Sequence, residues 1–589
     1  MTATTPNRAT PTPQLRPLGY SGAVRITAGP WKDRIDDAVA TYLAMPVDDV
    51  LHGYRLAAGQ DAPGRPMDGW SSTTTQSTFG QWVSGLARIG VTAGVPAASA
   101  RAVELVEGWA ATLGPDDDPR MSLYGLEKLL CGLVDVALYA DHPQSLRLVE
   151  RLVTWARHGL GTERKVASAS DFAGGEHSVH EWYTFAENLH RAWLAGADDT
   201  VEEYACTFHY DTWWDRFRTA PAAGQAWDVP VWLHAYSHVN TFASAAAAFE
   251  ATGEPGYLDI LRNAHTWVTT TQTFATGGYG PGELTVPDDG TLGGSLEWRT
   301  DSAEIVCGTW AAFKLSSALL RHTGDARYGD WVEQLVHSGL GAVTPVRPDG
   351  TSPYYQDYRL GITTRLPHWD HWPCCSGTYL QGVAHLPDLV YHQDDEGLAV
   401  LLALPSTVTF EHDGRTVELE QTTTFPESDT TTLTVTGGET ATWALKVRVP
   451  AWSAGLRLFV NGEEVPAVAD EAGWAVVART WVPGDRLEVT LGAHLRVLPV
   501  DRQHPNRVAF AHGPVVLAQP ADWTAPVALP VPWSMVDLAA AFTQEAPLRY
   551  RPLSLGTARL PVGPLVPLGQ IPERYPCRVY MDVDAPRII

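Results

Sequence analysis

Apolar residues with a helical period dominate the chain from about Trp31 to His392. Recurrence every three to four positions is typical of amphipathic helices that bury one face. The strong segments are Ser77–Ile89, Ala98–Leu113, Leu123–Tyr139, Gln144–His158, Glu181–Ala195, Val231–Thr252, Tyr257–Thr271, Ala303–His322, Tyr328–Leu340 and Ser376–His392, and weaker ones are Asp33–Leu43 and Glu202–Phe217. The pattern predicts about a dozen helices joined by short connections.

One helix junction occurs twice. Thr252–Tyr257 reads Thr-Gly-Glu-Pro-Gly-Tyr, and Thr323–Tyr328 reads Thr-Gly-Asp-Ala-Arg-Tyr. The glycine suits a left-handed helix C-terminus, and the acidic residue favours the start of the next helix. Repeated helical hairpins indicate an (α/α)₆ barrel or a superhelical solenoid, and their irregular lengths favour the closed barrel.

After Gly397 the pattern changes to short apolar or alternating segments. Turn pairs such as Asp413-Gly414 and Asn461-Gly462 divide them, as in antiparallel β-structure. The expected strands are Leu398–Leu404, Thr431–Thr436, Ala441–Val449, Leu456–Val460, Trp474–Ala478 and Leu487–Leu491. The fold class is therefore mainly α with β: a barrel followed by two β-sandwich-type domains.

We expect four regions along the chain. Residues 1–29 form a flexible leader whose stretch Arg16–Ile26 adds a strand to a β-region, and residues 30–396 form the catalytic barrel. Residues 397–500 form a β-sandwich, and residues 501–589, with short strands and many prolines, form a small β-domain.

Composition narrows the function classes. The 589-residue chain has a net charge of −25 and no basic run, which argues against nucleic-acid or anionic-membrane binding. The N-terminal residues lack the apolar stretch of a secretory signal, and no apolar run is long enough to span a bilayer. Six scattered cysteines fit a reducing compartment, so we expect a cytoplasmic protein.

Two adjacent cysteines, Cys374 and Cys375, are the strongest chemical signal. They follow the polar stretch His368–Trp372 and precede a predicted helix that Ser376 would cap. Thiols at a helix N-terminus are more acidic because backbone N–H groups and the helix dipole favour the thiolate. The pair is therefore a candidate reactive or metal-binding site, with two buried apolar cysteines as the alternative.

Two further segments carry candidate groups. The glycine-dense loop Gly277–Glu283 ends in a carboxylate that could act as a general acid or lie exposed on a loop. In Asp301–Cys307, Glu304 and Cys307 are three residues apart and so share one face of the predicted helix. Together with Cys374 and Cys375 they make a three-thiolate, one-carboxylate set that suits tetrahedral Zn²⁺.

The remaining candidates lie on predicted helices. His234 and His238 are one helical turn apart, a spacing that can bind metal, substrate hydroxyls or simply other core groups. Glu187 is either a buried acid of the cavity or a surface residue.

In combination, several segments resemble glycoside hydrolase family 127, the β-L-arabinofuranosidase-like proteins. The resemblance runs through most of the chain, and no one segment would suffice. The segments are Gly277–Glu283, Leu233–His238, the Cys-Cys-x-Gly-Thr of Cys374–Thr378, Lys446–Trp452, Val460–Glu463 and His512–Val516.

This resemblance implies a retaining glycosidase with a zinc ion held by one glutamate and three cysteines. It implies Cys374 as nucleophile and metal ligand, Cys375, Cys307 and Glu304 as further metal ligands, and Glu283 as acid/base. It also implies substrate-pocket positions at His238 and Glu187, and we expect His234 and Tyr355 to bind substrate with them. The expected partner is a small oligosaccharide or glycoconjugate, and a homodimer is compatible with the sequence.

The chain departs from the family in one place. The family usually has Glu-x-Cys, whereas Ile305 and Val306 separate Glu304 from Cys307. Either the local backbone compensates, or Asp301 replaces Glu304, or the site holds little metal. The leading hypothesis is an exo-acting β-L-arabinofuranosidase. The alternatives are a relative that acts on another sugar through a metal-free carboxylate pair, and a non-catalytic carbohydrate-binding protein.

Overall fold

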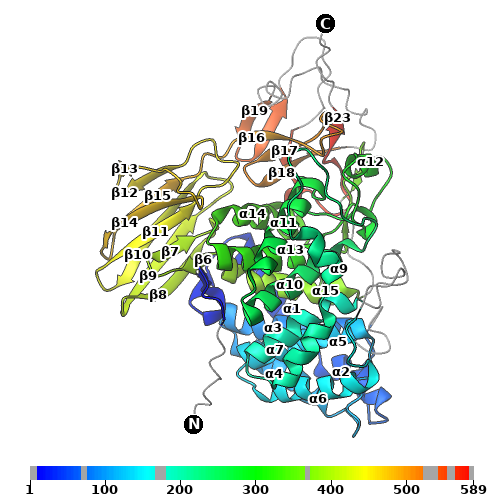
Figure 1. Cartoon of the computed structure of the whole chain (residues 1–589). Helices are drawn as coiled ribbons and strands as arrows, with labels where there is room; N and C mark the ends of the chain where they lie inside the picture. Colours follow the sequence, from blue (N-terminus) through cyan, green and yellow to red (C-terminus); the bar gives the residue numbers. More distant parts are fainter. Residues whose placement is uncertain are drawn as a thin grey trace.

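The computed structural model describes residues 10–67, 76–165, 181–361, 363–364, 372–521, 542–552 and 564–582. Its helices fill the first two thirds of the chain, and two β-regions follow (Figure 1). The helices are α1 (Pro30–Ala44), α2 (Val47–Ala57), α3 (Gln76–Thr92), α4 (Pro96–Ala110), α5 (Leu123–Tyr139), α6 (Gln144–Gly159), α7 (Ala186–Leu194), α8 (Asp199–Ala205), α9 (Asp211–Trp214), α10 (Ala235–Thr252), α11 (Pro255–Thr271), α12 (Thr291–Ser295), α13 (Ile305–Thr323), α14 (Gly329–Ser338) and α15 (Cys374–His385).

The helices form a closed double ring. Among the described residues, six inner helices lie side by side in the order α3, α5, α7, α10, α13 and α15, and α15 packs back against α3. Helices α4, α6, α8, α11, α14 and α1 pack outside them. Closure of this ring confirms the (α/α)₆ barrel and excludes an open solenoid.

The repeated junctions behave as the sequence predicts. Gly253 and Gly324 end α10 and α13 in the left-handed conformation, with φ of 71° at each residue. Each glycine N–H also bonds back to a helix carbonyl, of Phe249 and Leu320 respectively. These caps turn the chain outward, so that each inner helix is followed by an outer one.

Several predicted helix bounds were wrong. The Glu202–Phe217 segment is broken into α8, α9 and short 3₁₀ turns, and the sequence pattern missed α2 and α12. The helix expected over Ser376–His392 begins at Cys374 and ends at His385, so Ser376 is not its cap. Pro387 lacks the N–H that a longer helix needs, and the chain passes through a 3₁₀ turn into strand β6.

The first β-region is a sandwich of two sheets (Figure 1). Arg16–Ile26 contributes to both sheets, as its sequence suggested, because β1 pairs with β6 and β2 pairs with β8. One sheet contains β1 (Arg16–Pro17), β6 (Tyr391–Gln393), β7 (Gly397–Val400), β11 (Ala441–Arg448) and β14 (Trp474–Trp481). The other contains β13 (Glu463–Val465), β12 (Arg457–Val460), β15 (Arg486–Thr490), β10 (Thr430–Gly438), β9 (Arg415–Thr423), β8 (Ser406–His412) and β2 (Val24–Ile26).

The last β-region reaches back toward the barrel. Its main sheet contains β16 (Leu495–Pro499), β17 (Arg507–His512), β18 (Val515–Pro520), β22 (Pro576–Arg578) and β5 (Thr363–Thr364), with β21 (Val566–Pro567) and β23 (Met581–Asp582) paired at its sides. A separate hairpin joins β19 (Phe542–Ala546) to β20 (Arg549–Pro552). Strand β16 pairs with β17, although we expected the sandwich to run to residue 500. Strand β5 pairs with β22 and comes from the part of the chain before Cys374, so one strand of this sheet belongs to the barrel region.

Helix α14 ties the barrel to both β-regions. The Arg448 guanidinium of β11 lies 2.5 Å from the buried Glu333 carboxylate, and Trp452 donates to the same carboxylate at 2.7 Å. On the other side, Ser338 Oγ donates to the Pro514 carbonyl and accepts from Val516 N–H, both at 2.8 Å. None of the helices in the described parts of the chain is long and apolar enough to cross a bilayer.

We predict that Arg448→Met destabilises the protein by about 3–5 kcal/mol, because it leaves the Glu333 carboxylate buried without its cation. Chemical denaturation monitored by Trp fluorescence measures this loss. The matched control is Arg457→Met, which breaks the fully exposed Arg457–Glu464 pair and should leave the midpoint unchanged. Equal midpoints for the two variants would contradict the prediction.

Candidate active site

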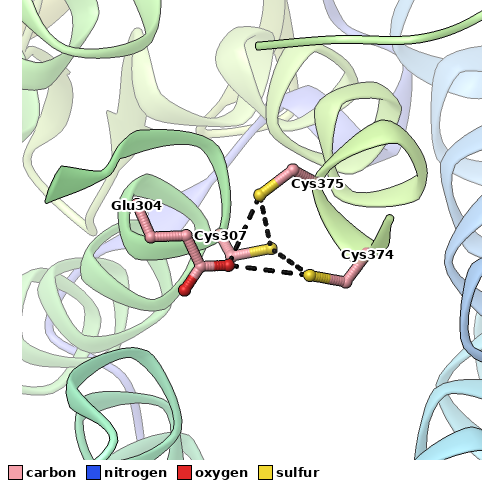
Figure 2. A group of neighbouring side chains, drawn as sticks. All are labelled: Glu304, Cys307, Cys374 and Cys375. Carbon is pink, nitrogen blue, oxygen red and sulfur yellow. Dashed lines mark hydrogen bonds between the residues drawn. The ribbon is translucent and has the colours of Figure 1, made fainter. Parts of the chain in front are cut away.

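Four buried ligand groups meet where two inner helices begin (Figure 2). Cys374 and Cys375 are the first two residues of α15, and Cys307 lies in the first turn of α13. Glu304 comes directly before α13, and one ligand atom from each residue lies within 4.8 Å of the other three. Cys307 and Cys374, which are 67 residues apart in the sequence, thus lie next to each other.

The position of Glu304 differs from the one that the sequence predicted. Its backbone is not helical, with φ −78° and ψ 84°, and it belongs to β3 (Ala303–Glu304), which pairs with β4 (Tyr355–Gln356). The expectation that Glu304 and Cys307 share a helix face was therefore wrong. The bend before α13 turns the carboxylate toward the thiols, so the backbone compensates for the longer spacing. Asp301 binds Arg299 instead, at 3.0 and 2.8 Å.

The spacing of the four groups fits a tetrahedral metal ion. Cys307 Sγ lies 3.6 Å from Cys374 Sγ and 3.3 Å from Cys375 Sγ. Glu304 Oε1 lies 3.6 Å from Cys374 Sγ and 3.4 Å from Cys375 Sγ. Zinc bonds of about 2.3 Å to sulfur and 2.1 Å to oxygen give tetrahedral edges of about 3.5–3.8 Å. The donor types and their separations both suit Zn²⁺.

Electrostatics in the cluster favour a single thiolate. Hydrogen bonds from the Cys307 and Cys375 thiols lower the pKa of Cys374 well below its usual value, and the Lys128 ammonium adds to this effect. Burial raises the pKa of Cys307 and of Cys375. Burial and the neighbouring Cys374 charge raise the pKa of Glu304 to about 8. All four of these buried groups can be deprotonated at the same time only if a cation lies beside them.

His234 links this cluster to the glycine loop. It precedes α10, and its Nδ1 lies 2.5 Å from Glu181 Oε1. Its Nε2 faces two carboxylates, 3.6 Å from Glu283 Oε2 and 3.7 Å from Glu304 Oε2. Burial alone would lower the pKa of His234, but Glu181 and then Glu304 raise it well above its usual value. The predicted acid/base Glu283 and the predicted metal ligand Glu304 therefore both face the imidazolium of His234.

The predicted acid/base Glu283 is held by its loop and by Tyr355. Gly280 and Gly282 take left-handed conformations on either side of Pro281, and Glu283 itself has φ 62°. The Tyr355 hydroxyl donates to Glu283 Oε1. Tyr355 also pairs with Glu304 in the β3–β4 ladder, so one short ladder positions both carboxylates. The side chain of Glu283 is partly exposed, as a group that meets a leaving group must be.

The other predicted pocket residues lie elsewhere. His238 Nδ1 bonds to the His234 carbonyl at 2.9 Å, and its ring packs among Tyr183 and Trp213. Burial lowers the pKa of His238 to about 3, so its ring is neutral, whereas His234 faces three carboxylates. Glu187 pairs with Lys314 at 2.5 Å and lines a different cavity.

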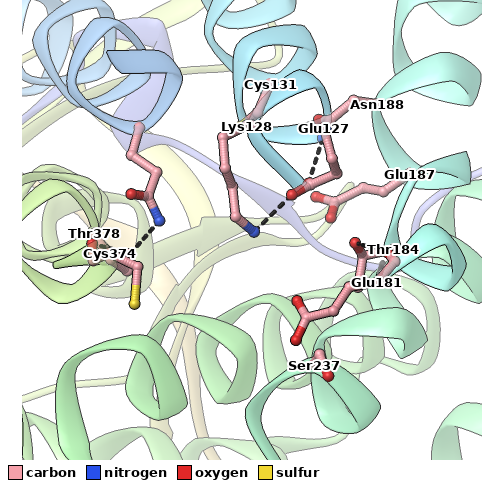
Figure 3. Close-up of polar contacts among 12 residues, drawn as sticks. Glu127, Lys128, Cys131, Glu181, Thr184, Glu187, Asn188, Ser237, Cys374 and Thr378 are labelled. Atoms are coloured by element: carbon pink, nitrogen blue, oxygen red, sulfur yellow. Dashed lines mark hydrogen bonds and ion pairs between the residues drawn. The ribbon is translucent and has the colours of Figure 1, made fainter. Parts of the chain in front are cut away.

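Sequence reasoning missed a buried charge pair beside the cysteines. Lys128 Nζ lies 2.6 Å from Glu127 Oε2 and donates to the Tyr236 hydroxyl at 3.1 Å. In Figure 3, Lys128, Glu181 and the Cys374 sulfur point toward the same interior space. The one available signal was the placement of Glu127 and Lys128 inside a largely apolar helix. Glu181, the first residue of the predicted segment Glu181–Ala195, gave no signal of its own.

The fold and the site together define an (α/α)₆-barrel glycoside hydrolase. The model of the β-L-arabinofuranosidase GH127 catalytic domain matches residues 107–388, and that of the GH127 middle domain matches residues 397–493. The chain belongs to glycoside hydrolase family 127.

Solved structures share the whole fold. A GH127 β-L-arabinofuranosidase from Geobacillus stearothermophilus T6 is 18% identical with a TM-score of 0.71, covering 95% of this chain and 100% of its own. A GH127 β-arabinofuranosidase is 17% identical with a TM-score of 0.71, covering 97% and 98%. A third, described as a glycoside hydrolase, is 16% identical with a TM-score of 0.67, covering 97% and 98%. No curated protein matches the chain.

We predict that Gly282→Ala lowers kcat/KM by about 10²-fold, because its Cβ would lie 1.6 Å from Nη2 of Arg299, whose guanidinium Asp301 holds, so that either this pair or the Glu283 loop must shift. Gly462→Ala is the control, since Gly462 also has positive φ but no atom within 4 Å of a Cβ. Both variants carry a similar backbone strain of about 1–2 kcal/mol, so only activity should separate them. Full activity in Gly282→Ala would show that the loop tolerates the change.

Proposed function

We propose that the protein is a retaining exo-glycosidase that removes a furanose, most simply β-L-arabinofuranose, from a small oligosaccharide or glycoconjugate. Cys374 is the nucleophile, Glu283 is the acid/base, and Glu304, Cys307, Cys374 and Cys375 hold Zn²⁺. The observation that carries the proposal is the cluster of three sulfurs and one carboxylate oxygen, with four of its six separations at 3.3–3.6 Å and all of them within 4.8 Å. His234 lies between this cluster and Glu283. The names of the family models and of the similar structures support the choice of sugar.

In the first step, the Cys374 sulfur attacks the anomeric carbon while the bond to the leaving oxygen breaks. Glu283 gives its proton to that oxygen, so the aglycone departs neutral. In the second step, Glu283 takes a proton from water, the water oxygen attacks the same carbon, and the carbon–sulfur bond breaks to restore the thiolate. Two displacements at one carbon return the original configuration.

The surrounding residues prepare these steps. Tyr355 fixes one oxygen of Glu283 and leaves the other facing His234. Lys128 adds positive charge near the Cys374 sulfur. When bound, Zn²⁺ would keep the thiolates deprotonated and moderate their basicity, which also makes the sulfur a better leaving group.

A second mechanism has its own support. Glu283 and Glu304 both approach His234 Nε2, at 3.6 and 3.7 Å, so their carboxyl groups lie close together. Such a pair could act as acid/base and nucleophile without metal. The three thiols that converge on Glu304 favour the first mechanism, because this second one gives them no role.

We predict that the purified protein contains about one zinc per chain, the stoichiometry of one closed four-ligand site. Cys307→Ser should lose most of this metal, because oxygen replaces one sulfur donor of the cluster. Cys577→Ser, which changes a buried cysteine in β22, is the control and should keep it. Elemental analysis gives the result, and equal zinc in both variants would contradict the proposed ligand set.

We predict that Cys374→Ser abolishes turnover on β-L-arabinofuranosides, because a serine hydroxyl is a much weaker nucleophile than a thiolate. Assays with aryl furanosides and aryl pyranosides on the same sample also establish the sugar. Retained turnover in Cys374→Ser would favour the carboxylate pair.

We predict that Glu283→Gln slows hydrolysis of alkyl or sugar leaving groups by about 10²–10⁴-fold, since these need a proton to depart. The nitrophenolate group departs without a proton, so the first step with nitrophenyl furanosides should slow much less. Steady-state kinetics on both substrate types provides the comparison. An equal loss on both would remove Glu283 from the role of general acid.

A further inference from the structure

Two exposed tryptophans lie next to the loop that carries Glu283. Trp232 is 48% exposed and Trp298 is 66% exposed, and every other tryptophan in the described part of the chain is more buried. Tryptophan is usually buried over most of its large surface, although a single exposed apolar side chain is common and needs no explanation. The occurrence of both exposed rings at one loop of the site does need one.

Trp232 is bonded to the backbone that follows Glu283. Its N–H donates to the Thr285 carbonyl at 2.8 Å, and the Thr285 N–H donates to the Leu233 carbonyl at 2.8 Å. His234, two residues further along, has its Nε2 3.6 Å from Glu283 Oε2. The φ of Trp232 is 66°, a left-handed conformation that bulky residues rarely adopt. Residues in such conformations are concentrated at functional sites.

Trp298 is connected to the backbone that precedes Glu283. The Arg299 guanidinium lies against Gly282, where a Cβ would be 1.6 Å from its Nη2, and the guanidinium carbon lies 4.7 Å from the centroid of the Trp298 ring. Arg299 in turn bonds to the Asp301 carboxylate at 3.0 and 2.8 Å, and the Gly282 N–H donates to the Asp301 carbonyl at 2.8 Å. The indole therefore packs on a guanidinium that covers the residue before Glu283.

The segment before Trp298 is anchored to the last β-region. The Gly293 N–H donates to the Asp501 carboxylate at 2.7 Å, and the Gly293 carbonyl accepts from the Arg507 guanidinium at 2.7 Å. Leu296 is fully buried. An exposed ring on an anchored segment loses little conformational freedom when a ligand covers it, so less of the binding free energy is spent on ordering.

The burial of the site sets the direction in which a substrate lies. Cys374 is 3% exposed, whereas the side chain of Glu283 is 28% exposed. The sugar that bonds to Cys374 would therefore lie at the buried end, and the group that takes a proton from Glu283 would lie toward solvent. Proton transfer needs the leaving oxygen within about 2.6–3.2 Å of the carboxyl group. The leaving group thus begins at this loop, beside Trp232 and Trp298.

We propose that Trp232 and Trp298 bind the leaving group, and that this group is itself a sugar. This inference rests on the proposed glycosidase function and adds the class of leaving group to it. A sugar ring has an apolar face that packs on an indole and hydroxyls at its edge that need hydrogen bonds.

Arg299 and Asp301 supply the polar partners for such a sugar. Their side chains are 21% and 33% exposed, beside Trp298. An arginine and a carboxylate that bond to each other keep further N–H groups and lone pairs for ligand hydroxyls. An alkyl or aryl leaving group would contact the rings but would make no use of this polar pair, which favours a sugar.

Isothermal titration calorimetry on the full chain tests the proposal with thioglycosides, in which sulfur replaces the linking oxygen and resists hydrolysis. The probes are the (1→2)-, (1→3)- and (1→5)-linked thio-disaccharides of β-L-arabinofuranose with L-arabinose, and the methyl and phenyl thio-β-L-arabinofuranosides. We expect the tightest disaccharide to bind at least about tenfold more tightly than the methyl and phenyl compounds, which corresponds to about 1.4 kcal/mol.

Variants assign this preference to the two rings. Trp298→Ala and Trp232→Ala should each weaken binding of the disaccharide by about tenfold and reduce its advantage over the methyl compound. Trp298→Phe and Trp232→Phe are the matched controls, because a phenyl ring keeps a flat apolar face, and they should retain most of the advantage. Circular dichroism checks the fold of each variant, and Trp298→Ala, which alters the more exposed side chain, decides the matter if Trp232→Ala misfolds.

Four results would overturn the proposal: equal binding of the disaccharides and the methyl compound, equally tight binding of the phenyl compound, no binding of any probe, or no effect of either alanine variant. Hydrolysis of the oxygen-linked disaccharides, assayed on the same sample, tests the glycosidase function separately. Tight binding of a thio-disaccharide that depends on the two rings, without hydrolysis of its oxygen-linked counterpart, would contradict the glycosidase function and still support a second sugar at Trp232 and Trp298.

Discussion

The structure depends on the burial of three thiols and a carboxylate at a single point. Each of these groups is costly to bury as an anion without a cation beside it. The starts of α13 and α15 nevertheless hold all four within 4.8 Å, and three of the four are less than 4% exposed. The proposed metal ion would resolve this conflict, since it would give each of the four groups a strong bond.

Other features of the barrel follow from that constraint. Helices α13 and α15 must lie side by side in the inner ring, and the β3–β4 ladder must bend Glu304 away from the helix. The same ladder carries Tyr355, which holds Glu283, so one ladder positions both the proposed acid/base and the proposed metal ligand Glu304. Helix α14 links the barrel to the sandwich through Glu333 and to the last β-region through Ser338.

Much of this architecture could be predicted from the sequence because helical period and turn chemistry are local signals. Leu123–Tyr139 was predicted to the residue, and the Gly253 and Gly324 junctions behave as capped helix ends. The four cluster residues could be proposed from donor type alone. The placement of Glu304 could not be predicted, because a separation of three residues from Cys307 is compatible with one helix face and also with a strand that precedes the helix. Glu181 was missed because its partner His234 lies 53 residues away in sequence. Lys128 was missed because the adjacent Glu127 gives no sign of burial, and its contact with Tyr236 spans 108 residues.

The most direct test of the account is to find the atom that bonds to the sugar. An epoxide analogue of β-L-arabinofuranose should react with the nucleophile and stay attached, and peptide mass spectrometry then locates the adduct. The account predicts that the label lies on the peptide containing Cys374, and that fragmentation of this peptide assigns the label to Cys374. A label on Glu304 or Glu283, with Cys374 unmodified, would contradict it.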